Sequence, residues 1–159
     1  MTANAAVNAD LAARITRLEA LEEIRKLKHR YLNACDLKEV EVIRDCFATG
    51  PVLIDYEGVG VFEDRDSFVD LYQSLACHPN VIDSHHGANP EIELTSDTTA
   101  KGRWGLGYFN LDANTGETRQ LGVMYEDEYR RDPDGWKIVV TRSRLLSVVL
   151  GRSAGSAPA

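Results

Sequence analysis

The segments TRQLGVMYEDEYRR (118–131) and WKIVVTRSRLLSVVL (136–150), separated by DPDG (132–135), decide the fold class. Both long segments are rich in β-branched and aromatic residues, which favour extended backbone. The tetrapeptide between them is composed of residues that favour tight turns. Two strands joined by so short a connection run antiparallel. The C-terminal part of the chain therefore predicts a hairpin of two long strands.

Two further β-rich segments precede this hairpin, at residues 85–94 and 99–111, and turn sequences separate them from each other and from the hairpin. Helical patterns come earlier, because Leu11, Ile15 and Leu18 begin an apolar stripe with the spacing of three and four that marks one face of a helix. The predicted helices cover residues 11–36, 38–47 and 64–76, with a short strand at 52–56 and its hairpin partner at 58–62.

Helices followed by an antiparallel meander indicate the α+β class rather than a parallel sheet. Four long strands and three N-terminal helices can form a cone, in which the helices cover one face of a curved antiparallel sheet and leave a pocket inside. The chain has 159 residues, which fits one domain. We assign that domain to residues 11–150, with a flexible segment at 1–10 and a disordered tail at 151–159.

The composition excludes several classes of function. A net charge of −7 argues against nucleic acid and anionic membrane surfaces as partners. The N-terminus has no signal-peptide pattern, and no apolar run reaches the roughly 20 residues that a membrane span needs. Three cysteines without CxxC spacing indicate reduced thiols, and therefore a cytoplasmic protein. The histidines lack the spacing of metal ligands, and no glycine-rich nucleotide motif is present, so we expect neither a metal nor a cofactor.

Asp36 and His85 are the most informative polar residues. Asp36 ends the first helix, where a carboxylate is electrostatically unfavourable unless it caps the next helix or has a cationic partner. His85 and His86 begin a predicted strand, so one of them faces inward. Either histidine could be an ordinary packed or exposed residue. An acid that contacts an imidazole in a pocket makes an oriented general base.

Three more residues have both a structural and a functional interpretation. Tyr31 lies on the apolar stripe of the first helix and is either a core residue or a hydrogen-bond donor to a substrate oxygen. Arg142 and Arg144 share one face of the last strand. They are either exposed, or one of them projects into the cone and binds an anionic or carbonyl oxygen.

The order and spacing of several short motifs resemble a SnoaL-like domain of the NTF2-like superfamily, over residues 15–150. The motifs are Tyr31-x4-Asp36, Gly58-x-Gly60-x-Phe62, His85-x3-Asn89-Pro90-x-Ile92, Ala100-x-Gly-Arg-Trp104, Tyr125-x-Asp-Glu-Tyr129 and Asp134-Gly-Trp136-x-Ile138. The Tyr/Asp/His arrangement is similar to that of bile acid 7α-dehydratases, and the Asp–His pair is also similar to scytalone dehydratases and hexachlorocyclohexane dehydrochlorinases. One departure is Tyr108, which lies near the position where the bile acid enzymes carry an acidic residue.

The resemblance implies a cystatin-like barrel and a cofactor-independent lyase, most simply a dehydratase, acting on a hydroxylated hydrophobic ring compound such as a steroid or polyketide. The alternatives are a double-bond isomerase or cyclase that uses the same base, and a non-catalytic binding or oligomerisation module. A homo-oligomer is expected, with a trimer favoured over a dimer. The implied catalytic residues are His85, Asp36, Tyr31 and Arg144, and the candidate substrate-binding residues are Tyr56, Trp104, Tyr108, Asn89 and Arg142.

Overall fold

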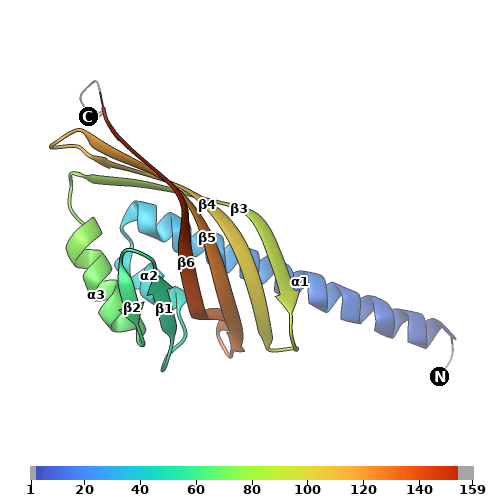
Figure 1. The fold of residues 1–159 in the computed structure, drawn as a ribbon. Coiled ribbons are helices and arrows are strands. Elements are labelled where there is room, and N and C mark those ends of the chain that lie inside the picture. Colours follow the sequence, from blue (N-terminus) through green and yellow to red (C-terminus); the bar gives the residue numbers. More distant parts are fainter. Residues whose placement is uncertain (1–2, 154–159) are drawn as a thin grey trace.

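A computed structural model describes residues 3–153 and shows three helices packed on one face of a six-stranded curved sheet (Figure 1). In chain order the elements are α1 (Ala3–Leu37), α2 (Val40–Cys46), β1 (Leu53–Tyr56), β2 (Gly60–Phe62), α3 (Arg65–Ala76), β3 (Val81–Leu94), β4 (Thr99–Asp112), β5 (Glu117–Asp132) and β6 (Gly135–Arg152). The predicted α+β class and order of elements are confirmed.

The sheet has the strand order β2-β1-β6-β5-β4-β3 and is mixed rather than antiparallel throughout. The four long strands form the predicted meander, but β1 pairs in parallel with β6, from Leu53 beside Val140 to Tyr56 beside Ser143. A parallel pair needs a long connection, and β2, α3 and the β3–β5 meander provide it between β1 and β6. The expectation of a purely antiparallel sheet is therefore corrected.

Both ends of the described part of the chain, residues 3–153, are more regular than expected. Residues 3–10, which we predicted to be flexible, are the first turns of α1. This stretch is rich in alanine, which has the highest intrinsic helix propensity, so the helix extends there without tertiary contacts. Gly151 and Arg152 of the predicted tail belong to β6, and residues 1–2 and 154–159 lie outside the described part of the chain.

The first part of α1 projects beyond the edge of the sheet, toward the N-terminus in Figure 1. The described side chains from residue 4 to residue 19 are exposed, and Ala20 is the first buried one. From there α1 crosses the inner face of the sheet, where it contacts β3 most extensively. We call residues 3–19 the arm of α1.

The interior of the cone is filled largely by aromatic side chains. Edge-to-face ring contacts link Tyr31 to Phe47, Phe47 to Phe68, and Tyr56 to both Phe68 and Tyr125, with centroids 5.4–5.7 Å apart. Such contacts add stabilisation to the burial of the rings. The expected pocket does not occupy this deep part of the cone.

One ion pair is fully buried in this interior. Lys28 Nζ lies 2.8 Å from Asp127 Oδ2, and neither side chain is exposed to solvent. The Asp127 carboxylate also accepts hydrogen bonds from the hydroxyls of Tyr129 and Thr141, both at 2.7 Å. Lys28 Nζ lies 3.8 Å from the centroid of the Tyr125 ring, close enough for a cation–π contact. The pair joins α1 to β5 and β6.

Gly87 on β3 allows α1 to approach the sheet closely. A Cβ atom at this position would lie 2.6 Å from Cδ1 of the buried Leu32. We expect Gly87→Ala to lower the free energy of unfolding by about 1–3 kcal/mol, because overpacking displaces neighbouring side chains. Urea denaturation measures the effect. The control is Gly107→Ala on β4, where an added Cβ meets nothing within 4 Å; equal losses in both variants would contradict the prediction.

Candidate functional site

Asp36 and His85 meet at the end of α1. His85 Nδ1 lies 2.5 Å from Asp36 Oδ1, and the backbone N–H of His85 donates to both carboxylate oxygens at 3.1 and 3.0 Å. An ionised carboxylate only accepts hydrogen bonds, so the neutral imidazole in this contact carries its proton on Nδ1. Nε2 then has the free lone pair, and no hydrogen bond joins it to another described residue.

The local fold explains why these two residues meet. Asp36 belongs to the last turn of α1, and the next helix does not use it as a cap, because the N-cap of α2 is Glu39. β3 begins at Val81, earlier than the predicted residue 85. His85 pairs with Tyr108 of β4 on the face that α1 covers. Its neighbour His86 pairs with Gly107 on the opposite face, as the alternation of an extended strand requires.

Four polar residues surround this contact. The Tyr108 ring lies against the His85 imidazole, with centroids 4.7 Å apart, and its hydroxyl donates to Asp83 Oδ1 at 2.6 Å. Asn110 Nδ2 donates to the same oxygen at 2.9 Å, and Lys38 Nζ pairs with the other carboxylate oxygen, Oδ2. The site therefore combines two carboxylates, one ammonium group, one imidazole and one phenol.

The environment changes the acidity of two of these groups. Burial would raise the pKa of Asp83, but hydrogen bonds from Lys38, Tyr108 and Asn110 outweigh it and hold that pKa below its ordinary value. Asp83 is thus a carboxylate at neutral pH. Burial, together with the hydrogen bond to Asp83 and its charge, raises the pKa of Tyr108, so its phenol stays protonated.

The site is partly accessible to solvent. The side chains of His85 and Asp36 are 15% and 26% exposed. Pairing across the sheet aligns His85, Tyr108, Leu121 of β5 and Val148 of β6 in one row on the inner face. Leu121 is partly exposed and Val148 is exposed. An apolar surface therefore leads from solvent to the imidazole.

Tyr31 and Tyr56, predicted to contact substrate, lie deeper in the cone. Their hydroxyls are hydrogen-bonded to each other at 2.8 Å, and both side chains are buried. Burial raises the pKa of Tyr31 well above its ordinary value, so its hydroxyl remains a neutral hydrogen-bond partner. The structure places neither hydroxyl against the Asp36–His85 pair; Tyr31 takes the core position that was its structural alternative.

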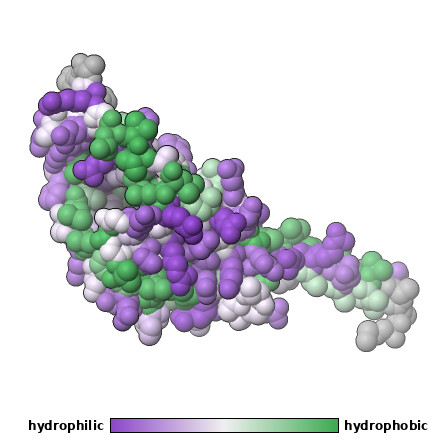
Figure 2. All heavy atoms as spheres, viewed as in Figure 1, coloured by the Kyte–Doolittle hydropathy of each residue, from purple (hydrophilic) through white to green (hydrophobic). Residues whose placement is uncertain are grey.

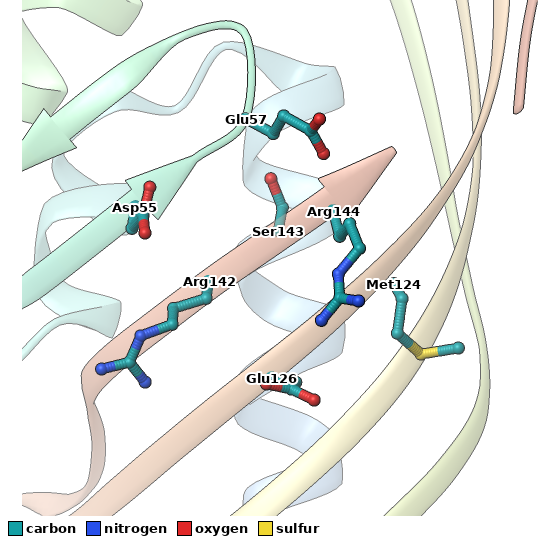
Figure 3. Close-up of a pocket in the computed structure, with 7 residues that line it drawn as sticks. All are labelled: Asp55, Glu57, Met124, Glu126, Arg142, Ser143 and Arg144. Atoms are coloured by element: carbon teal, nitrogen blue, oxygen red, sulfur yellow. The ribbon is translucent and has the colours of Figure 1, made fainter. Parts of the chain in front are cut away.

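Arg142 and Arg144 lie on the outer face of the sheet, opposite His85. Both side chains line a hollow of about 350 Å³, and Figure 3 shows them on the side of the strands away from α1. Arg142 pairs in register with Glu126, and Arg144 with Met124. Alternation along β6 directs Ser143 inward instead. The expectation that one of these arginines projects into the cone is therefore corrected.

Two other candidate substrate-binding residues lie away from the site. Trp104 is completely buried, and its indole N–H donates to the Tyr129 hydroxyl at 2.9 Å, so it is a core residue. Asn89 is exposed at a bulge in β3, with a positive φ of 51°. Of the five candidate substrate-binding residues, the structure brings only Tyr108 to the Asp36–His85 pair.

Sequence reasoning missed Lys38, Asp83 and Asn110. A signal existed for Asp83, because it precedes His85 by two residues and so shares its face in any extended strand. The predicted strand began at residue 85, which hid this relation. Lys38 was interpreted only as part of the next helix. Across residues 3–153, no group of three or more His, Cys, Asp or Glu side chains is arranged to hold a metal ion.

The family follows from comparison with a model of SnoaL-like domains, which matches residues 16–142. The chain belongs to the SnoaL-like family. Among curated relatives, uncharacterized proteins of Mycobacterium tuberculosis and Mycobacterium bovis are each 26% identical to this SnoaL-like domain over 120 residues, covering 74% of this chain and 79% of theirs. Because these relatives are uncharacterized, they do not indicate an activity for this chain.

Solved structures show the same fold at lower identity. A type 2 hexachlorocyclohexane dehydrochlorinase superposes with a TM-score of 0.80 at 18% identity, covering 91% of this chain and 97% of that one. A candidate scytalone dehydratase from Novosphingobium aromaticivorans superposes with a TM-score of 0.79 at 18% identity, covering 91% of this chain and 96% of that one. An NTF2-like protein with a cystatin-like fold from the same species has a TM-score of 0.72 at 23% identity, covering 87% of this chain and 90% of its own. This SnoaL-like domain therefore has the NTF2-like fold that the resemblance implied.

Within residues 3–153 of the SnoaL-like chain, no helix is both long enough and apolar enough to span a membrane.

Proposed function

We propose that the protein is a cofactor-independent lyase in which His85 is the general base. The observation that carries this proposal is the 2.5 Å contact between His85 Nδ1 and the Asp36 carboxylate, which leaves Nε2 as the ring nitrogen that can accept a proton. An acid that orients an imidazole in this way sets its tautomer and stabilises the imidazolium that forms when the base takes a proton.

The reaction that fits this arrangement is the elimination of water. His85 Nε2 removes a proton from a carbon next to a carbonyl group, and the electron pair of the broken C–H bond forms a C=C double bond as the C–O bond to the leaving hydroxyl breaks. The imidazolium returns its proton to the departing hydroxyl, so water leaves and His85 is neutral again. The Asp36 carboxylate balances the positive charge while it exists.

The inner face of the sheet supports the proposed substrate class. The row of His85, Tyr108, Leu121 and Val148 presents an aromatic ring and two aliphatic side chains next to the base. A hydroxylated hydrophobic ring compound, steroid-like or polyketide-like, can lie on this surface with its acidic C–H at Nε2. The names of two structural neighbours, a dehydrochlorinase and a candidate scytalone dehydratase, agree with elimination from a ring compound.

The test is a substrate screen in deuterated water, with the products analysed by mass spectrometry. Hydroxylated steroid and polyketide ketones are incubated with the protein, and loss of 18 mass units identifies a dehydratase. Deuterium incorporation without loss of water, together with a shifted double bond in the product, would identify an isomerase instead. Binding of these compounds without any turnover would overturn the lyase proposal in favour of a binding module.

We also propose that the protein is a homo-oligomer, with a trimer favoured over a dimer by the family resemblance. The arm of α1 supports association, because Val7, Leu11, Ile15 and Leu18 form an exposed apolar stripe on it. Figure 2 shows further apolar side chains along the C-terminal half of β6, where Leu146, Val148, Val149 and Leu150 are exposed.

We expect Ile15→Glu to shift the mass measured by light scattering after gel filtration toward that of the 17.7 kDa chain, because a charge in an apolar contact is costly. Glu19→Gln on the same exposed arm is the control and is expected to leave the mass unchanged. A wild-type chain that is monomeric at all concentrations tested would contradict the proposal.

A further inference from the structure

A second ion pair lies beside the Asp36–His85 contact and joins the same two elements. Lys38, which directly follows α1, pairs with Asp83 of β3. Asp36 and Lys38 are two residues apart on one side, and Asp83 and His85 are two residues apart on the other. Two adjacent contacts therefore bind the end of α1 to β3. In one of them the acid comes from α1, and in the other it comes from β3. We call the Lys38–Asp83 pair the clasp.

The backbone at Lys38 is unusual for a lysine. Its φ is +61°, and the N–H of the next residue, Glu39, donates to the Ala34 carbonyl at 2.9 Å, which closes the helix. Helices commonly end with a residue in this left-handed conformation, and glycine is strongly preferred there because a side chain costs about 1 kcal/mol or more. The side chain at this strained position pairs with Asp83 and lies 6.0 Å from the centroid of the Tyr72 ring.

The clasp reaches the base through one further residue. Asp83 is almost completely buried, at 4% exposure of its side chain, and accepts hydrogen bonds from Lys38, Tyr108 and Asn110. The ring of Tyr108 in turn lies against the His85 imidazole. Asp83 thus fixes the phenol hydroxyl, and the fixed phenol ring covers one side of the base.

We propose that Lys38 and Asp83 are positioning residues, which hold Tyr108 and the end of α1 against His85 and keep the charge around the imidazole balanced. This inference deepens the proposed function and rests on it for the activity, but not for the behaviour of the imidazole itself. Asp36 and Tyr108 contact His85 directly, and the Lys38–Asp83 pair lies beside them. Of the other charged and titratable side chains nearby, Tyr72 on α3 lies next to Lys38, and the charge of Arg119 on β5 acts on Tyr108.

The charge balance makes an asymmetric prediction. Removing the Lys38 ammonium leaves the Asp83 carboxylate uncompensated near His85, and a nearby negative charge favours the imidazolium. Removing the Asp83 charge leaves the ammonium uncompensated, which disfavours the imidazolium. A merely structural clasp predicts something different, since loss of either partner would loosen the same contact and change the imidazole in the same direction.

The experiment is an NMR titration of the imidazole ¹⁵N nuclei, with the His85 signals assigned by their loss in His85→Gln. We expect the His85 titration midpoint to move to higher pH in Lys38→Met and to lower pH in Asp83→Asn, with the double variant between them. Lys26→Met, which removes the same charge from an exposed position of α1, is the control and should leave the midpoint in place. Shifts in one common direction, or none, would overturn the proposal.

Lys38→Gly separates the role of the side chain from that of the backbone. Both variants leave the buried Asp83 carboxylate without its counter-ion, but glycine also relieves the left-handed strain, so we expect Lys38→Gly to be thermally more stable than Lys38→Met, while the His85 titration shifts in the same direction in both. On a substrate from the screen, kcat should fall by up to about 10²-fold with little change in KM, because a misplaced base slows the chemical step. Unchanged kcat in Lys38→Gly would contradict the positioning role.

The two proposals can fail separately. If no substrate is turned over, the lyase proposal fails, yet the opposite titration shifts can still be observed. If His85→Gln abolishes turnover while the Lys38 and Asp83 variants titrate and react as the wild type does, the lyase proposal stands and the clasp does not position the base.

Discussion

Replacing His85 by glutamine is expected to lower kcat by about 10²–10⁴-fold on any substrate that the protein dehydrates, the usual contribution of a general acid–base residue. Glutamine has a similar size and can still donate a hydrogen bond to Asp36, but it cannot accept a proton at neutral pH. KM should change little, because the loss concerns a step of the reaction rather than the binding of the substrate. Steady-state kinetics with the dehydrated product as the readout measure both constants.

His86→Gln is the matched control. It makes the same chemical change one residue along β3, on the opposite face of the sheet, where His86 pairs with Gly107. This variant should react like the wild type. A His85→Gln protein with full activity would remove His85 from the mechanism, and equal losses in both variants would indicate damage to β3 instead of loss of the base.

Asp36→Asn complements this test, because asparagine still accepts a hydrogen bond from Nδ1 but does not stabilise the imidazolium by charge. We expect a loss of kcat comparable to that of His85→Gln, and little further loss when both changes are combined, since residues that act as a unit are not additive. Additive losses would show that Asp36 and His85 act independently.

Breaking the buried Lys28–Asp127 pair is expected to cause the largest loss of stability of any single change discussed for this chain. Lys28→Met leaves the Asp127 carboxylate without its counter-ion at a position closed to solvent. Removing one partner of a buried ion pair typically costs about 3–5 kcal/mol, because the other charge is then buried uncompensated. Urea denaturation followed by circular dichroism measures the free energy of unfolding.

The double variant Lys28→Met with Asp127→Asn gives the decisive comparison. It removes both charges and keeps a polar group for the hydroxyls of Tyr129 and Thr141, so it should be less destabilised than the sum of the single variants. The exposed pair of Glu22 and Arg25 is the control, where Glu22→Gln should change stability by no more than about 0.5 kcal/mol. A Lys28→Met protein whose free energy of unfolding falls as little as that of Glu22→Gln would contradict the prediction.

Much of the fold was predictable because it depends on local patterns. Apolar spacing located the three helices, and β-rich segments with turn sequences between them located the long strands within a few residues. The parallel contact of β1 with β6 was not predictable in this way, since it joins residues 53–56 to residues 140–143 across most of the chain. No local pattern encodes such a pairing.

The candidate site was predictable where a residue needed a partner. Asp36 at the unfavourable end of a helix indicated a hydrogen-bonding partner, and the structure provides His85. The catalytic roles of Arg144 and Tyr31 came from the resemblance, whereas their positions also allowed an exposed arginine and a core tyrosine. Strand alternation directs the arginine outward, and the tyrosine hydroxyl is hydrogen-bonded to that of Tyr56 in the core. Such outcomes depend on register and on packing partners, which neither composition nor spacing specifies.

The arm of α1 has a mechanical consequence. The family model begins at residue 16, whereas the helix begins at Ala3, so about thirteen residues of helix precede the matched domain and extend roughly 20 Å at 1.5 Å per residue. No loop interrupts α1 between this extension and Asp36. A partner that binds the arm therefore contacts the same continuous helix that carries the Asp36 carboxylate. Because no hinge lies between them, a tilt or rotation of the arm would also move the carboxylate that orients His85.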